Sequence, residues 1–407
     1  MLIKPKLLFC ALFFALISLF SRSQITTNVK LSDYYTGAIN PDYCRVIKTS
    51  DNGVLLAVAP GNELIDEKAI TLIKFDSEDN ILWAKKLFSF YVRVCVTEDQ
   101  NGDYIICSTD PEGYSHIVKV SPEGETLWAK KCTHTRATTI DVFATESHYF
   151  MFGNISWGSG DAYPYIAKFE LNGELVWSKM YFSEPEGSST TKVIFNDNKF
   201  TISGSLGPNN VSMGALVWSV DLGGNVLHAV KYPFGMSTFP RIMFRRSNNN
   251  IVVFASLNSY PGTLMFMETN EMGEILNLKE YSAYHVSAYL AVAHEEGYTL
   301  FLSSYRENEG EAWIPGLLDL DTEGTILQSY GYDSSPDRFI ASTFLKTGQS
   351  YQWYGCNFIE ENEFLWMGKS VNTPDYYCEQ TPIDLNVSEL ETEPSNWPLV
   401  IYDSLNF

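Results

Sequence analysis

Residues 119–130 read KVSPEGETLWAK, and the same phrase occurs as KFDSEDNILWAK at residues 74–85 and as KFELNGELVWSK at residues 168–179. Each copy joins an apolar segment to a polar turn, then to an apolar pair, a tryptophan and a lysine. A repeat of about fifty residues is typical of propellers and solenoids, in which each unit buries its apolar face against its neighbours. Fainter copies follow at Asp221–Gly224, Gly273–Lys279 and Asp321–Gly324.

The turn inside the phrase explains its composition. An Asp or Glu at the end of one strand, followed three residues later by glycine, suits a tight turn in which the glycine takes a positive φ. The apolar pair and the tryptophan then begin the next strand, where we expect the tryptophan to pack between neighbouring units. The residues of this structural repeat are Trp83, Trp128 and Trp177 with Gly124, Gly173, Gly224, Gly273 and Gly324.

Each unit contains four strand-like stretches. In the second unit these lie at 92–97, 104–108, 116–120 and 126–131, separated by turns and a loop rich in Asp, Asn and Gly. Four short strands in an antiparallel meander form the blade of a β-propeller. Because the third strand recurs seven times, the sequence predicts an all-β fold, a seven-bladed β-propeller of four-stranded antiparallel blades over residues 24–373.

The fourth strand has only six copies, since the chain leaves the repeat after Lys369. Ile25–Leu31 alternates apolar and polar residues ahead of the first unit, and we expect this N-terminal strand to close the ring as the outer strand of the last blade. That arrangement would leave no open sheet edge at the junction. Residues 374–407 depart from the repeat and are too few to fold alone, so we expect a short C-terminal extension that packs on the ring or is partly mobile.

The Lys-Phe-Asp-x-x-Gly-x-x-x-Trp-x-Lys unit resembles the repeats of secreted Bacteroidetes-type β-propellers and, more distantly, those of quinoprotein-like (PQQ-type) propellers. The resemblance covers residues 25–373 and implies the propeller fold, but it is poorly specific for activity. The chain lacks the adjacent cysteine pair that is typical of PQQ enzymes. We therefore expect no PQQ and no other cofactor.

Residues 1–23 have the composition of a signal peptide. Two lysines precede an apolar run at 7–20, and small residues stand before Gln24. The run is too short to span a bilayer comfortably, and an uncleaved anchor is the alternative. We expect cleavage after Ser23 and a mature chain without a transmembrane segment that is secreted, periplasmic or at the cell surface.

Cysteine usage agrees with export, because six cysteines follow the signal segment and an even number permits disulfides. Cys95 and Cys107 fall on adjacent strands of one blade and are a candidate disulfide. The alternative is that all six are small buried thiols. We expect no metal site, since no CxxC or HExxH spacing occurs.

The formal net charge of −21 disfavours binding to nucleic acid or to an anionic membrane. A well-solvated surface is the simpler reason for this charge. We expect a monomer whose partner is a protein or a polysaccharide.

One face of the predicted propeller carries the longer loops. In a four-stranded meander the second-to-third and blade-to-blade connections share a face, here called the long-loop face; they include Ser183–Ser189 and Ser205–Met213. Functional residues concentrate on loops that a rigid scaffold positions. Aromatic side chains there can stack on sugars or hold a peptide, or else pack on their own loops. The candidate ligand-binding residues are Trp157, Tyr163, Tyr260, Tyr305 and Trp313.

No GxSxG elbow or Walker loop occurs, and no catalytic constellation is visible. The sequence favours an exported, non-catalytic recognition module that binds protein or polysaccharide through the long-loop face. The alternatives are a propeller hydrolase or lyase acting at the central funnel, and an envelope-associated scaffold. These differ in residues brought together from different blades, which spacing along one chain does not reveal.

Overall fold

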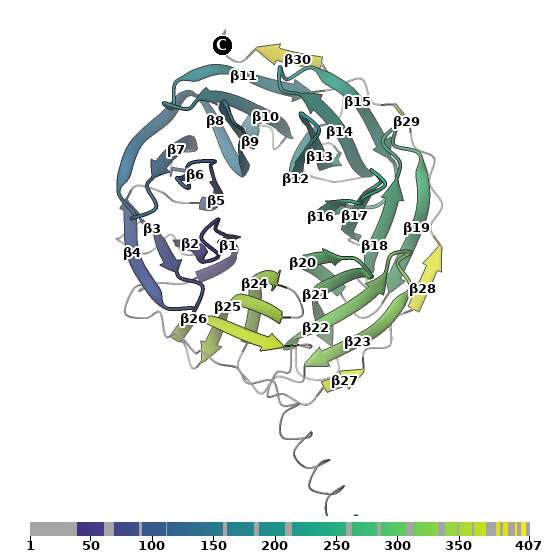
Figure 1. Cartoon of the computed structure of the whole chain (residues 1–407). Coiled ribbons are helices and arrows are strands. Elements are labelled where there is room, and N and C mark those ends of the chain that lie inside the picture. Colours follow the sequence, from purple (N-terminus) through teal and green to yellow (C-terminus); the bar gives the residue numbers. More distant parts are fainter. Residues whose placement is uncertain are drawn as a thin grey trace, which may run out of the picture.

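All the elements of the computed structural model that can be described are β-strands (Figure 1). None of its described residues belongs to a helix long and apolar enough to cross a membrane. The described residues are 39–60, 69–88, 92–110, 112–157, 161–182, 187–207, 214–257, 263–282, 286–306, 312–332, 338–347, 350–359, 362–371, 380–382, 386–389, 395–396 and 400–403.

Consecutive strands form antiparallel meanders. The first sheet joins β1 (Ile39–Lys48), β2 (Val54–Pro60), β3 (Ala69–Phe75) and β4 (Ile81–Phe88). A larger sheet contains two meanders, because the long strand β8 ends one and begins the next. Its meander strands are β5 (Val92–Glu98), β6 (Tyr104–Thr109), β7 (Tyr114–Val120), β8 (Thr126–Ala144), β9 (His148–Trp157), β10 (Asp161–Glu170) and β11 (Leu175–Phe182).

Three further meanders have four strands each, and the last sheet has three described strands. The four-stranded meanders are β12 (Ser188–Asn196), β13 (Lys199–Leu206), β14 (Gly214–Asp221) and β15 (Val226–Tyr232); β16 (Thr238–Arg245), β17 (Ile251–Leu257), β18 (Thr263–Thr269) and β19 (Ile275–Ser282); and β20 (Val286–His294), β21 (Gly297–Arg306), β22 (Ala312–Asp321) and β23 (Ile326–Tyr332). The last sheet is β24 (Arg338–Thr347), β25 (Ser350–Ile359) and β26 (Asn362–Val371).

The sheets follow one another around a central opening, with the first strand of each meander nearest the opening (Figure 1). Strand β1 contacts β24 and β25, so the first and last sheets lie against each other. This arrangement of antiparallel four-stranded sheets is that of a β-propeller. The predicted all-β fold of four-stranded blades is confirmed, whereas Ile25–Leu31, the predicted closing strand, lies outside the described residues.

The hydrophobic core lies between neighbouring sheets. One cluster combines Phe150 and Phe152 of β9 with Phe200 of β13 and Trp218 of β14. The Phe152 and Phe200 rings are 4.8 Å apart between centroids and meet edge to face. Such aromatic pairs add to the stabilisation that burial alone provides, at about 0.5–1.5 kcal/mol each. Bulky side chains on the middle strands of the meanders thus pack successive sheets against each other.

The tryptophans of the repeat phrase contact the turn of the next meander. The indole N–H of Trp83 donates a hydrogen bond to the Pro122 carbonyl at 2.8 Å. A Cβ atom added to Gly124 would lie 3.0 Å from the Trp83 ring, and one on Gly173 would lie 2.8 Å from the Trp128 ring. Both glycines have φ above +80°. Glycine is therefore required twice over at this turn, for its backbone angle and for the approach of the neighbouring indole.

The later copies of the repeat phrase keep the glycine turn, but the side chain that packs against the glycine changes. A Cβ on Gly224 would still meet a tryptophan, Trp177, at 2.8 Å. The hydroxyl of Tyr281 meets the Gly324 position, and the closest partner of Gly273 is Val230. Asn277 stands where the tryptophan would be and donates to the Glu323 carbonyl at 2.8 Å. The contact between sheets therefore persists without the aromatic ring.

The C-terminal segment runs around the outside of the ring. Its strands are β27 (Gln380–Pro382), β28 (Asn386–Glu389), β29 (Ser395–Asn396) and β30 (Val400–Asp403). They pair antiparallel with β23, β19, β15 and β11 in that order. We call these four strands the tail belt. It adds an edge strand to four successive meanders in the reverse of their chain order (Figure 1, yellow).

Candidate functional site

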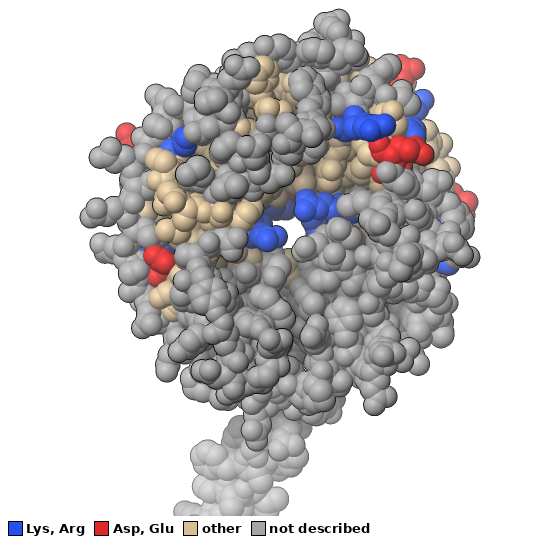
Figure 2. Space-filling model, turned by 180° about the vertical axis from the view of Figure 1, so that it is seen from behind, with Lys and Arg blue, Asp and Glu red and all other residues tan. Residues whose placement is uncertain are grey.

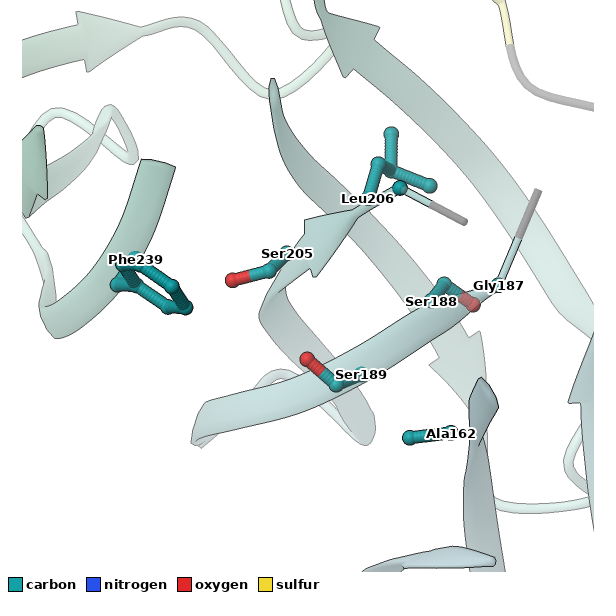
Figure 3. Close-up of a pocket in the computed structure, with 8 residues that line it drawn as sticks. Ala162, Gly187, Ser188, Ser189, Ser205, Leu206 and Phe239 are labelled. Atoms are coloured by element: carbon teal, nitrogen blue, oxygen red, sulfur yellow. The ribbon is translucent and has the colours of Figure 1, made fainter. Parts of the chain in front are cut away.

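A small cavity opens at the long-loop face between three neighbouring meanders. It has a volume of about 140 Å³ and lies where β12 and β16 begin and β13 ends (Figure 3). We call it the serine pocket. Its lining residues are Ala162, Gly187, Ser188, Ser189, Ser205, Leu206, Gly207 and Phe239.

Two buried serines of the pocket differ in their hydrogen bonding. Ser205 Oγ donates to the Thr238 carbonyl at 2.9 Å, which ties β13 to the start of β16. Ser188 Oγ is buried, with 3% of the residue exposed, and has no hydrogen-bond partner among the described residues. A buried hydroxyl without a partner costs about 1–3 kcal/mol. The Ser188 hydroxyl therefore lines the cavity as a polar group that makes no hydrogen bond to the described residues.

The remaining wall is neutral and partly apolar. Phe239 and Leu206 supply the larger apolar surfaces, and none of the eight lining residues is charged. Ser189 adds a third hydroxyl, with its oxygen drawn in Figure 3 between the strands that carry Ser205 and Ala162. Hydroxyls beside an aromatic ring suit a neutral polar group such as a sugar hydroxyl or an amide.

The structure distributes the predicted aromatic residues over two hairpins. Tyr163 is partly buried and packs edge to face on Phe182, with ring centroids 6.0 Å apart. Trp157 ends β9 and pairs with Asp161 across the β9–β10 hairpin. Tyr305 and Trp313 are direct cross-strand partners at the end of the β21–β22 hairpin. Tyr260 lies outside the described residues.

Two acidic side chains of the second meander are balanced by a lysine. Asp110 accepts hydrogen bonds from His116 at 2.9 Å and Lys131 at 2.7 Å, and Lys131 also reaches Glu112 at 2.9 Å. Burial alone raises the pKa of Asp110, but these hydrogen bonds and one from the Tyr114 N–H bring it down to about 2. The carboxylate is thus held in its charged form by its neighbours.

Cys95 and Cys107 are direct cross-strand partners in β5 and β6, and both are buried free thiols. Burial raises the pKa of Cys95 to about 12 and that of Cys107 well above its ordinary value. Both side chains belong to the core between the second and third meanders. Within the described residues no three His, Cys, Asp or Glu side chains are grouped as a metal site requires.

The sequence-based candidates on the long-loop face are aromatic residues, whereas the serine pocket is lined by small and hydroxyl residues. The pocket residues Ser188, Ser189 and Ser205 lie at the ends of two of those loops, Ser183–Ser189 and Ser205–Met213. The run Gly187-Ser188-Ser189 was the available signal, because small residues that start an inner strand leave room between sheets. Whether a serine hydroxyl is satisfied depends on its neighbours across the sheets, which no spacing reveals.

No protein-family model and no curated protein matches the sequence. Among solved structures the chain is similar to a subtype N10 neuraminidase-like protein of A/little yellow-shouldered bat/Guatemala, at 12% identity over 87% of this chain and 100% of that one, with a TM-score of 0.43. It is similar to a protein of unknown function from Bacteroides caccae at 12% identity, over 69% and 93% of the two chains, with a TM-score of 0.41.

A third similar structure is dihydro-heme d1 dehydrogenase NirN in complex with DHE, at 12% identity over 93% of this chain and 80% of that one, with a TM-score of 0.48. Similarities of this size carry no argument about activity. The assignment to the β-propellers rests on the strand pairing and on the ring of sheets.

Proposed function

We propose that this β-propeller is an exported recognition module that binds a neutral part of a protein or polysaccharide at its long-loop face. The observation that carries the proposal is the unpartnered hydroxyl of Ser188 in the wall of the serine pocket. A group that costs stability in the free protein gains a hydrogen bond when a ligand enters. The neutral lining suits sugar hydroxyls and peptide amides better than ions.

The same proposal includes finer features of the molecule. Counting the eight-stranded sheet as two blades and the last sheet as one, we infer seven blades, with Ile25–Leu31 as the missing outer strand of the last. We infer export through residues 1–23 and a role without catalysis. In an oxidising compartment the facing thiols of Cys95 and Cys107 would form a disulfide, which thiol titration under denaturing conditions tests.

The proposal is tested with residues 24–407 on a glycan array and in a pull-down from envelope fractions. The Ser188→Ala and Phe239→Ala variants should lose most of the signal that the wild type gives. Ser247→Ala, an exposed serine in a tight turn on the opposite face, is the matched control and should bind as the wild type does. Equal binding by all three variants would overturn the pocket as the site, and a Trp157→Ala/Trp313→Ala variant would then test the aromatic residues.

Ser188→Ala should also stabilise the free protein. Removing an unpartnered buried hydroxyl raises the free energy of unfolding by about 1 kcal/mol, whereas Ser205→Ala removes a hydrogen bond and lowers it by a similar amount. Urea unfolding of the two variants provides the comparison. A Ser188→Ala variant that is less stable than the wild type would show that the hydroxyl serves the fold and not a ligand.

A further inference from the structure

The first strand of every meander except the first contains a one-residue β-bulge at a similar place. The pairing with the second strand shifts between Val92 and Val94 in β5, and between Pro240 and Ile242 in β16. The same shift occurs in β8, β12 and β20. A bulge leaves one residue without a partner and re-aims its side chain. Because these strands border the central channel, the bulge residues are the ones that can turn toward it.

Two of the bulge residues are arginines. Arg93 is partly exposed and Arg241 is exposed, although Val94, Pro240 and Ile242 beside them are buried. Strands β5 and β16 lie on opposite sides of the central opening (Figure 1). The two arginines therefore occupy equivalent bulge positions in strands on opposite sides of the opening.

Arg93 is held in a strained conformation. Its φ is +47°, in the left-handed region that residues with a β-carbon rarely adopt. Such a backbone costs about 1 kcal/mol or more, and glycine would remove the cost. No ion pair joins Arg93 to a carboxylate of the described residues. An arginine that is strained at a bulge and has no ion pair within the described part of the chain indicates that its side chain is kept for a purpose other than folding.

More cations lie on the adjacent channel strands. Arg45 of β1 and Lys192 of β12 act electrostatically, together with Arg93, on the buried thiol of Cys95 in β5. Lys192 also pairs with the carboxylate of Asp141 at 3.2 Å. In Figure 2 Lys and Arg side chains border the central opening, while the coloured Asp and Glu lie toward the outer rim. A protein with a net charge of −21 thus gathers positive charge in its channel.

We propose that the central channel binds a tetrahedral oxyanion, phosphate or sulfate, between Arg93 and Arg241, with Arg45 and Lys192 supplying further positive charge. Guanidinium groups present paired N–H donors that match the oxygens of such an anion. Low-dielectric walls strengthen this attraction relative to the surface. The site is separate from the serine pocket and does not depend on the recognition function proposed for that pocket.

The oxyanion could arrive free or as a group on a larger molecule. Calorimetric titration at low ionic strength with inorganic phosphate, inorganic sulfate and a sulfated disaccharide distinguishes the two sources. A free anion predicts binding of the inorganic ions, whereas a sugar-borne group predicts tighter binding of the disaccharide. In either case one site per chain is expected, with an affinity that falls as sodium chloride is added.

Substitution tests the two arginines directly. Arg93→Gly removes the guanidinium at a position that favours glycine, so this variant should fold at least as stably as the wild type. Arg93→Gly and Arg241→Gln should each weaken oxyanion binding about tenfold or more. Lys130→Gln removes one exposed charge on the outer part of β8 and should leave binding unchanged. Ser188→Ala should likewise have no effect.

The proposal is overturned if none of the three probes binds the folded wild type. It is also overturned if the Arg93→Gly/Arg241→Gln double variant binds as tightly as the wild type. An equal loss in Lys130→Gln would point to the overall charge instead of the channel, and would overturn it as well.

Discussion

At the scale of single residues, the glycine and the tryptophan of the repeat phrase form one structural unit. Each glycine takes a left-handed angle to close its turn, and the space that its missing β-carbon leaves is filled from the preceding meander. In the first copy Asp79 takes the glycine's place at φ +68° and keeps the turn. There the turn hydrogen bond from the Asp79 N–H to the Asp76 carbonyl is 3.3 Å long, against 2.9 Å at Gly124.

Gly173→Ala should destabilise the protein more than Gly235→Ala. Both glycines have positive φ, so each alanine carries about 1 kcal/mol of backbone strain. At Gly173 the new methyl group would also meet the Trp128 ring at 2.8 Å, whereas at Gly235 nothing lies within 4 Å. The difference between the two free energies of unfolding, measured in urea, isolates the contact between neighbouring meanders. Equal values would mean that the indole moves aside freely.

Stability should fall in acid through Asp110. Its pKa is about 2 in the folded protein and 3.8 ordinarily, because the hydrogen bonds from His116 and Lys131 outweigh its burial. A carboxyl with a lowered folded-state pKa adds stability above its ordinary value and loses it as pH falls from about 4 to about 2. Urea unfolding across this range should show a shallower slope for Asp110→Asn than for the wild type. An unchanged slope would contradict the assignment.

At the scale of elements, local sequence predicted the strands better than their ends. In the second unit the predicted strands 92–97, 104–108 and 116–120 agree with β5, β6 and β7 to within two residues. The fourth was expected at 126–131, but β8 continues to Ala144 and becomes the first strand of the next meander. Residues 132–139 contain neither Gly nor Pro and several threonines, so nothing local ends the strand.

The candidate sites depend on contacts that period and composition do not encode. The repeat predicted that Gly124 and Trp128 belong to a turn and an outer strand, since both follow from local chemistry. Arg93 and Arg241 lie at bulges in the pairing between the first and second strands of their meanders. No glycine marks these bulges in the sequence. The unpartnered state of Ser188 likewise depends on the groups that β13 and β16 bring beside it. These features became visible only in three dimensions.

At the scale of the whole molecule, the tail belt pairs with four successive meanders. It meets them in the reverse of their order along the chain. Its strands cover the outer edges of β11, β15, β19 and β23. Pairing an edge strand removes open hydrogen-bonding groups that would otherwise invite another chain. The belt therefore both strengthens the ring and protects its rim.

Shortening the tail should lower the melting temperature in steps. Chains that end at Asn396, Glu389 and Pro382 lose one, two and three of the belt strands in turn. Each loss should lower the melting temperature by about 2 °C and promote association through the newly open edge. Differential scanning calorimetry and light scattering on the series test this. A melting temperature that stays constant across the series would mean that the belt adds nothing to the ring.

The belt also sets an order of events during biosynthesis. A ribosome releases the N-terminal meanders first, and domains and their parts begin to fold as they emerge. The residues of β30 are made after those of all the other described strands, yet they pair with β11, one of the earlier strands to appear. Completion of the belt must therefore wait until the ring beneath it exists. The belt strands thus find their partners only on meanders that have already folded, and a misplaced sheet would leave belt residues unpaired and open to proteolysis.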